Sequence, residues 1–334
     1  MKKFLMAGAL IASLSLSGCG AIDTGTGEAS SNQANPESGA PSIPENCNSS
    51  NPTLAVLLPN LANPYYVAMK NGFEDEGKSR GFNVKVQIAN DDDSQQLSQA
   101  QAMLQDRPCA LALNPVNSEP AAAIVKSAND LGIPVFNVNV GVSEKALSSQ
   151  GASIVQYLGA DNVDGGRVMG EQMLKDFGED SALEIGLVTA PDQTIVVSRD
   201  DGFKEAISSN PNAKVVSTVD GKVQLDTSVN VTSAMLQGNP TMNAIFASTG
   251  PAAQGALQAV QASGRDVKVY GFCASEIPLT DSYPGCVAQE PEKYGREVVD
   301  QIHTFVESGE VESEILKPLK QFTKGQTPAP GEVG

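Results

Sequence analysis

The chain has 334 residues, of which 40% are apolar, 18% charged and 5% aromatic. Asp and Glu outnumber Lys and Arg by 39 to 22, and the net charge of −17 argues against nucleic acid or an anionic lipid surface as a partner. The only histidine is His303, which excludes a metal site built from several histidines and leaves a single ring for any Ser-His-Asp triad.

The first residues predict export from the cytoplasm. Lys2 and Lys3 precede an apolar run from Phe4 to Leu16, which is too short to span a bilayer and is typical of an export signal. The run ends in Leu16-Ser17-Gly18-Cys19, which resembles the lipobox of bacterial lipoproteins, in which the cysteine thiol takes a diacylglyceryl group. Residues 1–18 are therefore expected to be a lipoprotein signal peptide and Cys19 the lipidated residue. The alternative is an ordinary signal peptide with a chance cysteine.

Residues 19–52 are expected to be a lipidated flexible tether. They consist largely of Gly, Ser, Asn, Pro and Thr, and segments so poor in large apolar side chains cannot offset the entropy lost on ordering. Acyl chains would hold the protein at the lipid bilayer without a membrane span. We therefore expect an extracytoplasmic protein, anchored to the cell membrane at the cell surface or in the periplasm.

From Thr53 onward, apolar runs of strand length alternate with segments of helical length and spacing. Continuous apolar strands fit a parallel sheet that is covered by helices on both faces. The predicted strands are 54–58, 84–89, 109–113 and 134–138, and the predicted helices are 64–80, 94–106 and 119–131. The fold class is therefore α/β, and this stretch forms one doubly wound lobe.

The pattern then repeats, which predicts a second lobe of the same kind. Its strands are expected at 183–188, 213–219, 244–247 and 267–272, and its helices at 163–176, 196–208, 227–237 and 252–262. A short strand at 287–289, a helix at 291–308 and a terminal run at 316–322 follow. Facing rims of two such sheets would enclose a ligand cleft at the carboxyl ends of the strands.

Several familiar chemistries have no support in the sequence. Neither lobe has a Gly-x-Gly-x-x-Gly motif or a P-loop after its first strand, which argues against a dinucleotide or a nucleoside triphosphate. The acidic run Asp91-Asp92-Asp93 lacks the glycine and the distal glutamate of an EF-hand loop, so we interpret it as a solvated turn that caps the next helix. No nucleophile, base and orienting group occur together. We therefore expect no cofactor, no metal site and no enzymatic activity.

Once Cys19 is assigned to lipid, Cys47, Cys109, Cys273 and Cys286 remain. An even number of cysteines outside the cytoplasm suggests disulfides. Of the possible pairings we favour Cys47 with Cys109, because these positions lie at neighbouring strand ends in a 2-1-3-4-5 strand order, and Cys273 with Cys286, which would close a short loop beside the cleft. The alternative is that all these thiols are buried and free.

The segment Pro59-Asn60-Leu61-Ala62-Asn63-Pro64-Tyr65-Tyr66 follows the first strand and opens the first helix. Asn63 can cap that helix, and Pro64 suits its first position. Tyr65 and Tyr66 would lie in the first turn at the carboxyl rim of the sheet, where aromatic faces can stack on the C–H faces of a sugar. They also share one arc of the helix with later apolar residues, so the alternative is that both tyrosines belong to the core.

This segment resembles the opening of ribose-type members of the type I periplasmic solute-binding protein family, which serve sugar ABC importers. The likeness extends from about Asn51 to Thr323. Further matches are Gly72, Ile133-Pro134-Val135, Asp161-Asn162 with Gly165-Gly166, Arg199 with Gly202-Phe203, Gly255-Ala256-Leu257, Gly271-Phe272 and Gln289. Each match is weak alone, and their order and spacing make the resemblance specific.

The resemblance implies two doubly wound parallel-sheet lobes joined by three crossovers, expected near Ala160, Gln289 and Pro318, which close on a ligand like a hinge. Residues 53–160 plus 290–318 would form the N-terminal lobe, residues 161–289 plus 319–325 the C-terminal lobe, and residues 326–334 a disordered tail.

The resemblance also implies which residues bind the ligand. Asn63 would hydrogen-bond ligand hydroxyls while Tyr65 and Tyr66 stack on the ligand. Arg199 would donate two parallel hydrogen bonds from the second lobe; the alternative is a salt bridge to a neighbouring aspartate at a solvated helix start. Gln289, at a crossover, can both donate and accept; the alternative is an ordinary strand-end residue.

Several ligand positions of the family differ here. Asn139-Val140 stands where sugar binders usually have Asp-Arg, Thr249 replaces a strand-end Asn or Asp, and Cys273 replaces the Asp after Gly-Phe. This chain therefore lacks carboxylates that the sugar binders of the family have. Each such carboxylate contributes about 1.5–3 kcal/mol to ligand binding through a charged hydrogen bond. We therefore expect a ligand that offers fewer hydroxyl donors than ribose, or offers them elsewhere, while Asn139, Thr249 and Cys273 still face it.

The sequence therefore predicts a monomeric, lipid-anchored solute-binding protein. It would capture a small neutral polar ligand, a sugar or polyol, between its lobes and deliver it to the membrane subunits of an ABC permease. The alternatives are a ligand-sensing module for a membrane signalling receptor and a binder of a non-carbohydrate small molecule.

Overall fold

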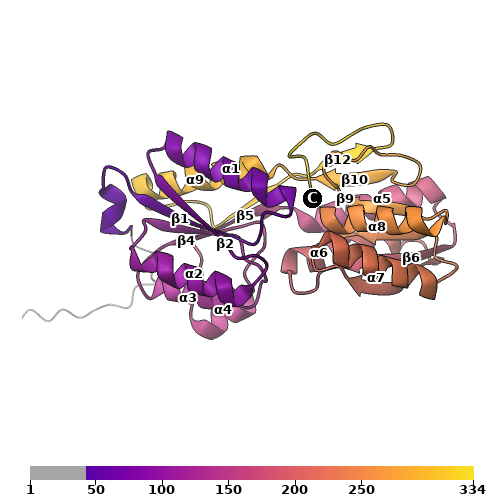
Figure 1. Cartoon of the computed structure of the whole chain (residues 1–334), viewed down its shortest axis with the longest axis horizontal. Coiled ribbons are helices and arrows are strands. Elements are labelled where there is room, and N and C mark those ends of the chain that lie inside the picture. Colours follow the sequence, from indigo (N-terminus) through magenta and orange to yellow (C-terminus); the bar gives the residue numbers. More distant parts are fainter. Residues whose placement is uncertain (1–42) are drawn as a thin grey trace, which may run out of the picture. The chain divides into compact units, whose positions relative to one another are not determined.

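The computed structural model describes residues 43–334. The predicted signal peptide, the lipidation site Cys19 and most of the predicted tether lie outside these residues. A short 3-10 helix, η1 (Glu45–Asn48), precedes two 6-stranded sheets, each with helices packed on both faces (Figure 1). This arrangement confirms the predicted α/β class with two parallel-sheet lobes. Within residues 43–334, no helix has the length and apolar character needed to cross a membrane.

The first sheet builds the N-terminal lobe. Its strand order is β11-β5-β4-β3-β1-β2, with all neighbours parallel, which confirms the predicted 2-1-3-4-5 order. The strands are β1 (Thr53–Leu58), β2 (Asn83–Ile88), β3 (Ala110–Leu113), β4 (Val135–Val138), β5 (Gln156–Ala160) and β11 (Glu314–Lys317). The helices are α1 (Pro64–Ser79), α2 (Asp93–Gln105), α3 (Ala122–Asn129), α4 (Glu144–Gln150) and α9 (Pro291–Ser308).

The side chains of β1 show why helices cover both faces of this sheet. Leu54, Val56 and Leu58 pack with α1 and α9, whereas Ala55 and Leu57 pack with α2 and α3. Successive side chains of a strand point to opposite faces. A strand that is apolar at every position therefore needs an apolar layer on each side.

The second sheet builds the C-terminal lobe in the order β12-β10-β9-β8-β6-β7, and β12 runs antiparallel to β10. Helices α5 and α6 cover one face, and α7 and α8 cover the other. The strands are β6 (Leu183–Thr189), β7 (Ala213–Asp220), β8 (Ala244–Ala247), β9 (Lys268–Phe272), β10 (Gly285–Ala288) and β12 (Lys320–Thr323). The helices are α5 (Asn162–Phe177), α6 (Thr194–Ile207), α7 (Leu225–Gly238) and α8 (Gly250–Ser263).

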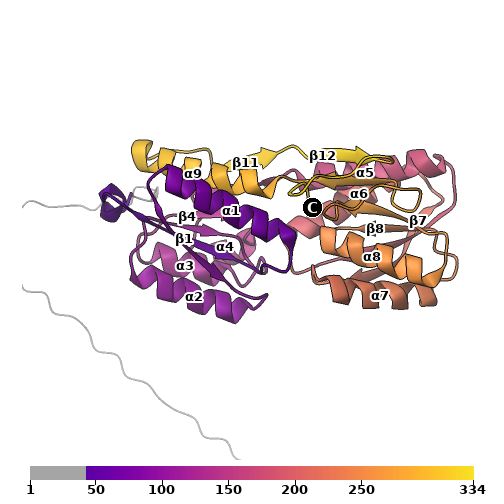
Figure 2. The same cartoon turned by 45° about the horizontal axis from the view of Figure 1, so that its top comes forward.

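The chain passes between the sheets after β5, after β10 and after β11. The last passage lies at Pro318, where a crossover is expected, and it divides the terminal run at 316–322 between two strands. Pro318 and Leu319 separate β11, which pairs with β5, from β12, which pairs with β10 (Figure 2, yellow). Proline has no N–H with which to continue a ladder, so the run breaks where the chain changes lobe.

The sequence did not predict β5 and α4. Leu158 is the only large aliphatic side chain of β5, and α4 buries only Ala146 and Leu147. Neither element produces the apolar periodicity by which strands and helices are recognised.

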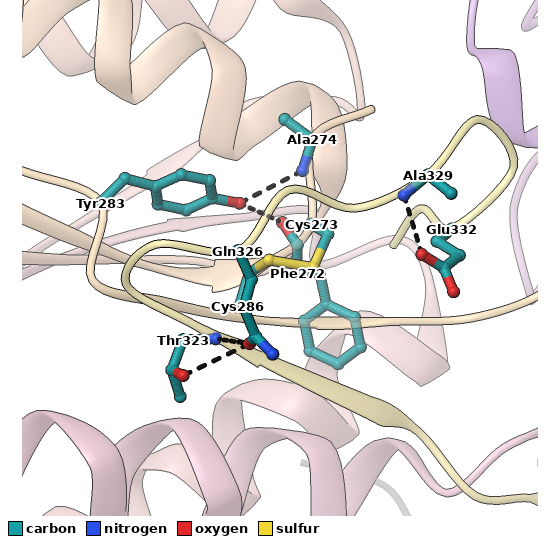
Figure 3. Close-up of a disulfide and its surroundings, with 9 residues drawn as sticks. All are labelled: Phe272, Cys273, Ala274, Tyr283, Cys286, Thr323, Gln326, Ala329 and Glu332. Atoms are coloured by element: carbon teal, nitrogen blue, oxygen red, sulfur yellow. Dashed lines mark hydrogen bonds between the residues drawn. A yellow bond between two sulfur atoms is a disulfide. The ribbon is translucent and has the colours of Figure 1, made fainter. Parts of the chain in front are cut away.

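Both predicted disulfides are present, so the alternative of free thiols is wrong. Cys47 is bonded to Cys109 with Cα atoms 4.7 Å apart, and Cys273 to Cys286 with Cα atoms 5.0 Å apart. The first disulfide ties η1 to the start of β3, and the second ties the end of β9 to β10. Figure 3 shows the second with Tyr283, whose hydroxyl accepts from the Ala274 N–H at 3.2 Å.

Residues 326–334 differ from the expected disordered tail. Val333 forms a β-bridge with Gln289 and is 3% exposed. The bridge and the buried valine supply the order that the polar composition of this segment does not indicate.

Candidate ligand-binding cleft

A small cavity between the two lobes gathers most of the predicted ligand-binding residues. This inner cavity has a volume of about 20 Å³, enough for roughly one water. It is lined by Asn63, Tyr65, Tyr66, Asn139, Gln193, Ile195, Arg199, Val223, Thr249, Gln289 and Gly334. Cys273 is the predicted ligand-binding residue that does not line it.

A second cavity, the outer cavity, adjoins the inner one. It has a volume of about 130 Å³ and shares Tyr66, Gln193 and Val223 with the inner cavity. Its lining also contains the charged residues Asp91, Asp192, Asp220 and Lys222. We use "the cleft" for the two cavities together.

The start of α1 places both tyrosines at the inner cavity. As predicted, Asn63 caps the helix: its Oδ1 accepts from the Tyr65 N–H at 3.0 Å. The rings of Tyr65 and Tyr66 have centroids 5.4 Å apart and stand at 80° to each other. Both side chains are 3% exposed and also pack in the N-terminal lobe's core. Both interpretations therefore apply, because each tyrosine packs in the core and also lines the inner cavity.

The Tyr65 hydroxyl lies between two amide side chains. Its oxygen is 3.0 Å from Oδ1 of Asn139 and 2.9 Å from Oε1 of Gln289. A phenol carries one proton, so it can donate to only one of these oxygens at a time. Nε2 of Gln289 is buried without a hydrogen-bond partner in the described part of the chain. The cavity wall therefore has one amide oxygen and one amide N–H₂ group available to a ligand.

The backbone at Asn139 aims this amide into the cleft. Its φ is +61°, a left-handed conformation that Asn tolerates better than most residues. The Asn139 carbonyl accepts from the Tyr157 hydroxyl at 2.8 Å. The following Val140 packs against Ile195 and Val196 of the C-terminal lobe. An apolar contact between the lobes therefore stands where the family pattern has an arginine.

Arg199 reaches the inner cavity from α6 and is 2% exposed. Its Nε donates to Oδ1 of Asn162 at 2.8 Å, and its Nη1 donates to the Ser248 carbonyl at 2.7 Å. Its Cζ lies 3.7 Å from the centroid of the Phe272 ring, a cation–π geometry. These contacts hold the guanidinium plane while Nη2 has no hydrogen-bond partner among residues 43–334.

The neighbouring aspartates do not neutralise Arg199. Asp200 accepts from the hydroxyls of Thr189 and Ser248, and Asp201 pairs with Lys204 at 3.8 Å. The alternative of a solvated salt bridge is therefore wrong. Burial lowers the pKa of Arg199 to about 10, because the charged form is poorly solvated in the cleft.

Thr249 and Cys273 supply no carboxylate to the inner cavity. Thr249 caps α8, where its Oγ1 accepts from the Ala252 N–H at 3.3 Å. The Cys273 sulfur is in the disulfide, and its carbonyl accepts from the Gly334 N–H at 2.9 Å. The lining of the inner cavity contains no Asp or Glu side chain.

Hydrogen bonds join the two lobes around the cavities. Oγ of Ser118 accepts from the Thr194 N–H at 2.9 Å, and the Ser118 N–H donates to the Asp192 carbonyl at 3.0 Å. Nε2 of Gln193 donates to the Val116 carbonyl at 3.1 Å. The lobes are thus joined by hydrogen bonds beside both cavities of the cleft.

Sequence reasoning missed Gln193, Ile195, Val223 and Gly334. The first three follow strands β6 and β7, so the rule that ligands bind at the carboxyl rim could have indicated them. Gly334 had no such signal, because nothing in its local sequence predicts that it returns to the cleft.

The acidic run caps a helix as predicted, and the one histidine lies away from the inner cavity. Asp92 caps α2, with Oδ1 accepting from the Gln95 N–H at 2.9 Å. His303 lies on α9, where its ring packs edge-on against Phe82 with centroids 6.4 Å apart.

Several known proteins are similar to this chain in sequence. Residues 54–310 match the family model described as periplasmic binding protein domain. A ribose import binding protein of Bacillus subtilis is 28% identical over 276 residues, 81% of this chain and 87% of that protein. A D-ribose/D-allose-binding protein of Pseudomonas aeruginosa is 31% identical over 229 residues, 66% of this chain and 70% of that protein.

Solved structures share the fold. An ABC transporter periplasmic solute binding protein from Actinobacillus succinogenes with bound D-allose matches with a TM-score of 0.74 and 24% identity, covering 82% of this chain and 98% of that one. A Caulobacter myo-inositol binding protein bound to myo-inositol matches with a TM-score of 0.72 and 25% identity, covering 82% and 93%.

Proposed function

The chain belongs to the periplasmic binding protein domain family, as a ribose-type member of type I, and from this premise we propose that it captures a small neutral polar ligand, a sugar or polyol, in the cleft and delivers it to an ABC permease. The family consists of extracytoplasmic substrate-binding proteins of transporters, not of enzymes. The mature protein would be monomeric and held at the membrane through acylated Cys19.

The observation that carries the proposal is the convergence of polar groups on the inner cavity. Asn63 and Asn139 come from the N-terminal lobe, Arg199 and Thr249 from the C-terminal lobe, and Gln289 from a passage between them. Amide, hydroxyl and guanidinium groups can exchange hydrogen bonds with ligand hydroxyls, and the neighbouring tyrosine rings can cover C–H faces. The sugars and the cyclitol named for the relatives support the same ligand class.

A thermal-shift screen of the purified protein tests this proposal. The panel contains ribose, allose, myo-inositol and other sugars and polyols, with nucleosides and small acids as comparison classes. A ligand at 100 times its dissociation constant stabilises the folded state by about 2.7 kcal/mol, so a carbohydrate hit should raise the melting temperature measurably. Shifts produced only by the comparison classes, or by none of the compounds with a folded protein, would overturn the carbohydrate assignment.

Membrane fractionation tests the anchor. The protein with Cys19 is expected in the membrane fraction and to incorporate a labelled fatty acid. The Cys19→Ser variant is expected in the soluble extracytoplasmic fraction without label. Equal partition of both forms would contradict lipidation.

A further inference from the structure

The segment after β12 folds back to the cleft. We call residues 326–334 the C-terminal strap. At its start, the Gln326 carbonyl accepts from the Leu279 N–H at 2.9 Å, and Oε1 of Gln326 accepts from the Thr323 N–H at 2.7 Å (Figure 3). The strap lies outside residues 54–310, which match the family model. It is attached beside the Cys273–Cys286 disulfide (Figure 3).

A turn and an ion pair hold the middle of the strap. Oε2 of Glu332 accepts from the Ala329 N–H at 2.8 Å (Figure 3), and the Glu332 N–H donates to the Ala329 carbonyl at 2.9 Å. Oε1 of Glu332 pairs with Nζ of Lys320 on β12. These contacts point the last residues toward the space between the lobes.

The end of the strap touches both lobes. Val333 packs among the residues of the N-terminal lobe's core that include Tyr65 and Tyr66. Its N–H donates to the Gln289 carbonyl at 3.2 Å, and its carbonyl accepts from the Gln289 N–H at 2.7 Å. The Gly334 carbonyl accepts from the Gly250 N–H, in the first turn of α8, at 2.8 Å.

The strap therefore occupies space and hydrogen-bonding capacity in the proposed binding site. Gly334 lines the inner cavity, whose remaining volume is about 20 Å³. The backbone N–H groups at a helix N-terminus favour an electronegative ligand atom. Here the Gly334 oxygen takes up one of these groups, the Gly250 N–H at the start of α8. A Cβ atom on Gly250 would lie 2.8 Å from the Cys273 carbonyl oxygen and 2.9 Å from the Gly334 oxygen, so the absence of a side chain on Gly250 leaves room for both.

We propose that the C-terminal strap is an internal competitor of the ligand: residues 332–334 occupy the inner part of the cleft, and a sugar-sized ligand binds when they leave. This inference rests on the proposed function for its ligand. The strap is suited to release because Pro328 and Val333 are its buried apolar side chains and most of its other side chains are exposed.

The test compares the full chain with a variant lacking residues 326–334 and with Val333→Asp, which places a charge at the buried anchor. Thr327→Asp is the matched control, because Thr327 is exposed on the same strap. Calorimetry with the carbohydrate panel is expected to give at least tenfold tighter binding for the deletion and for Val333→Asp, and unchanged binding for the control. Equal or weaker binding by the folded deletion variant would overturn the proposal.

A second readout needs no ligand. Ile195→Cys places a thiol on the inner cavity, in a Cys19→Ala background, and its reaction rate with a small methanethiosulfonate reagent is measured. Without the strap the rate is expected to rise at least tenfold. A faster reaction rate without the strap, together with no carbohydrate binding by either form, supports the strap proposal and refutes the proposed function. If both forms bind carbohydrate with equal affinity and their thiols react at equal rates, the strap proposal is refuted and the proposed function stands.

Discussion

At the scale of single residues, the unusual feature is a guanidinium that is buried without a carboxylate partner. Arg199 satisfies two of its nitrogens with Asn162 and the Ser248 carbonyl and rests on the Phe272 ring. Burying a charge without a partner is costly, so the folded protein gains little from it. A ligand that accepts a hydrogen bond from Nη2 would recover part of that cost.

Arg199→Met is therefore expected to weaken ligand binding by about 1.5–3 kcal/mol, the range of a charged hydrogen bond, with a much smaller change in the free energy of unfolding. Methionine keeps apolar contact with Phe272, and removal of an unpaired buried charge offsets the lost bonds to Asn162 and Ser248. Calorimetry and urea denaturation measure the two quantities. Arg167→Met is the control, because the Arg167 side chain is 44% exposed on α5. A loss of stability as large as the loss of affinity would mean that Arg199 is structural.

At the scale of elements, glycines set how closely α5 and α6 pack beneath Arg199. A Cβ atom on Gly166 would lie 1.9 Å from the Arg199 carbonyl oxygen, and one on Gly202 would lie 2.1 Å from the Val163 carbonyl oxygen. These neighbours are backbone atoms, which cannot rotate away as a flexible side chain can. The close approach of the two helices therefore determines where the Arg199 side chain begins.

Gly166→Ala is expected to push the helices apart, to destabilise the protein by about 1–3 kcal/mol, and to weaken ligand binding because Arg199 moves with α6. Gly238→Ala is the matched control: no atom lies within 4 Å of the added Cβ, so a neutral or slightly stabilising effect is expected at the end of α7. Urea denaturation and calorimetry check both variants. Similar effects of the two substitutions would contradict the packing explanation.

The attachment of the strap to the C-terminal lobe is expected to depend on pH. The pKa of Glu332 lies below its usual value, chiefly because of the hydrogen bond from Lys320, with help from the Ala329 N–H and the charge of Lys293. Lys293 itself pairs with Glu290 at 2.6 Å. A carboxyl group with a lowered folded-state pKa contributes stability above the ordinary pKa of glutamate, and that contribution is lost as pH falls through the lowered value.

Hydrogen exchange of residues 326–334, corrected for the intrinsic rate, is therefore expected to be slow near pH 6 and to accelerate below about pH 4, near the ordinary pKa of glutamate. Glu332→Gln is expected to exchange faster near pH 6 and to show little further acceleration, because it has no carboxylate to protonate. The same pH profile of hydrogen exchange in both proteins would show that the Glu332–Lys320 ion pair does not hold the strap in place.

At the scale of the whole described chain, the lobes are joined by backbone passages and by the contacts around the cleft. Ser118 accepts from the Thr194 N–H at 2.9 Å and lies 3.2 Å from the Thr194 hydroxyl oxygen. These bonds exist only while the lobes are together. If the ligand binds between the lobes, anything that stabilises their contact also tightens binding.

Ser118→Ala is accordingly expected to lower affinity by roughly fivefold, since a hydrogen bond contributes about 1 kcal/mol, and to act mainly by faster ligand dissociation. Ser127→Ala is the control, because the Ser127 hydroxyl bonds within α3 to the Ala123 carbonyl at 2.8 Å. Stopped-flow fluorescence gives both rate constants. Unchanged dissociation would show that this contact does not hold the ligand-bound state.

The sequence alone predicted the α/β class and the cap at Asn63, and it favoured the strand order of the first lobe and the disulfide pairing that the structure has. These features follow from local patterns: apolar runs, a capping residue before a proline, and cysteines at predictable strand ends. It also indicated which residues would gather at the carboxyl rim, because the rim is a property of the fold class rather than of exact packing.

Only the tertiary structure decided how those residues are used. Whether Arg199 meets an aspartate depends on which way its neighbours point, and Asp200 is drawn to the hydroxyls of Thr189 and Ser248. The return of residues 326–334 to the cleft depends on a bridge to Gln289 and on a bare glycine at the start of α8. Such contacts join residues far apart in the chain, and no local periodicity records them.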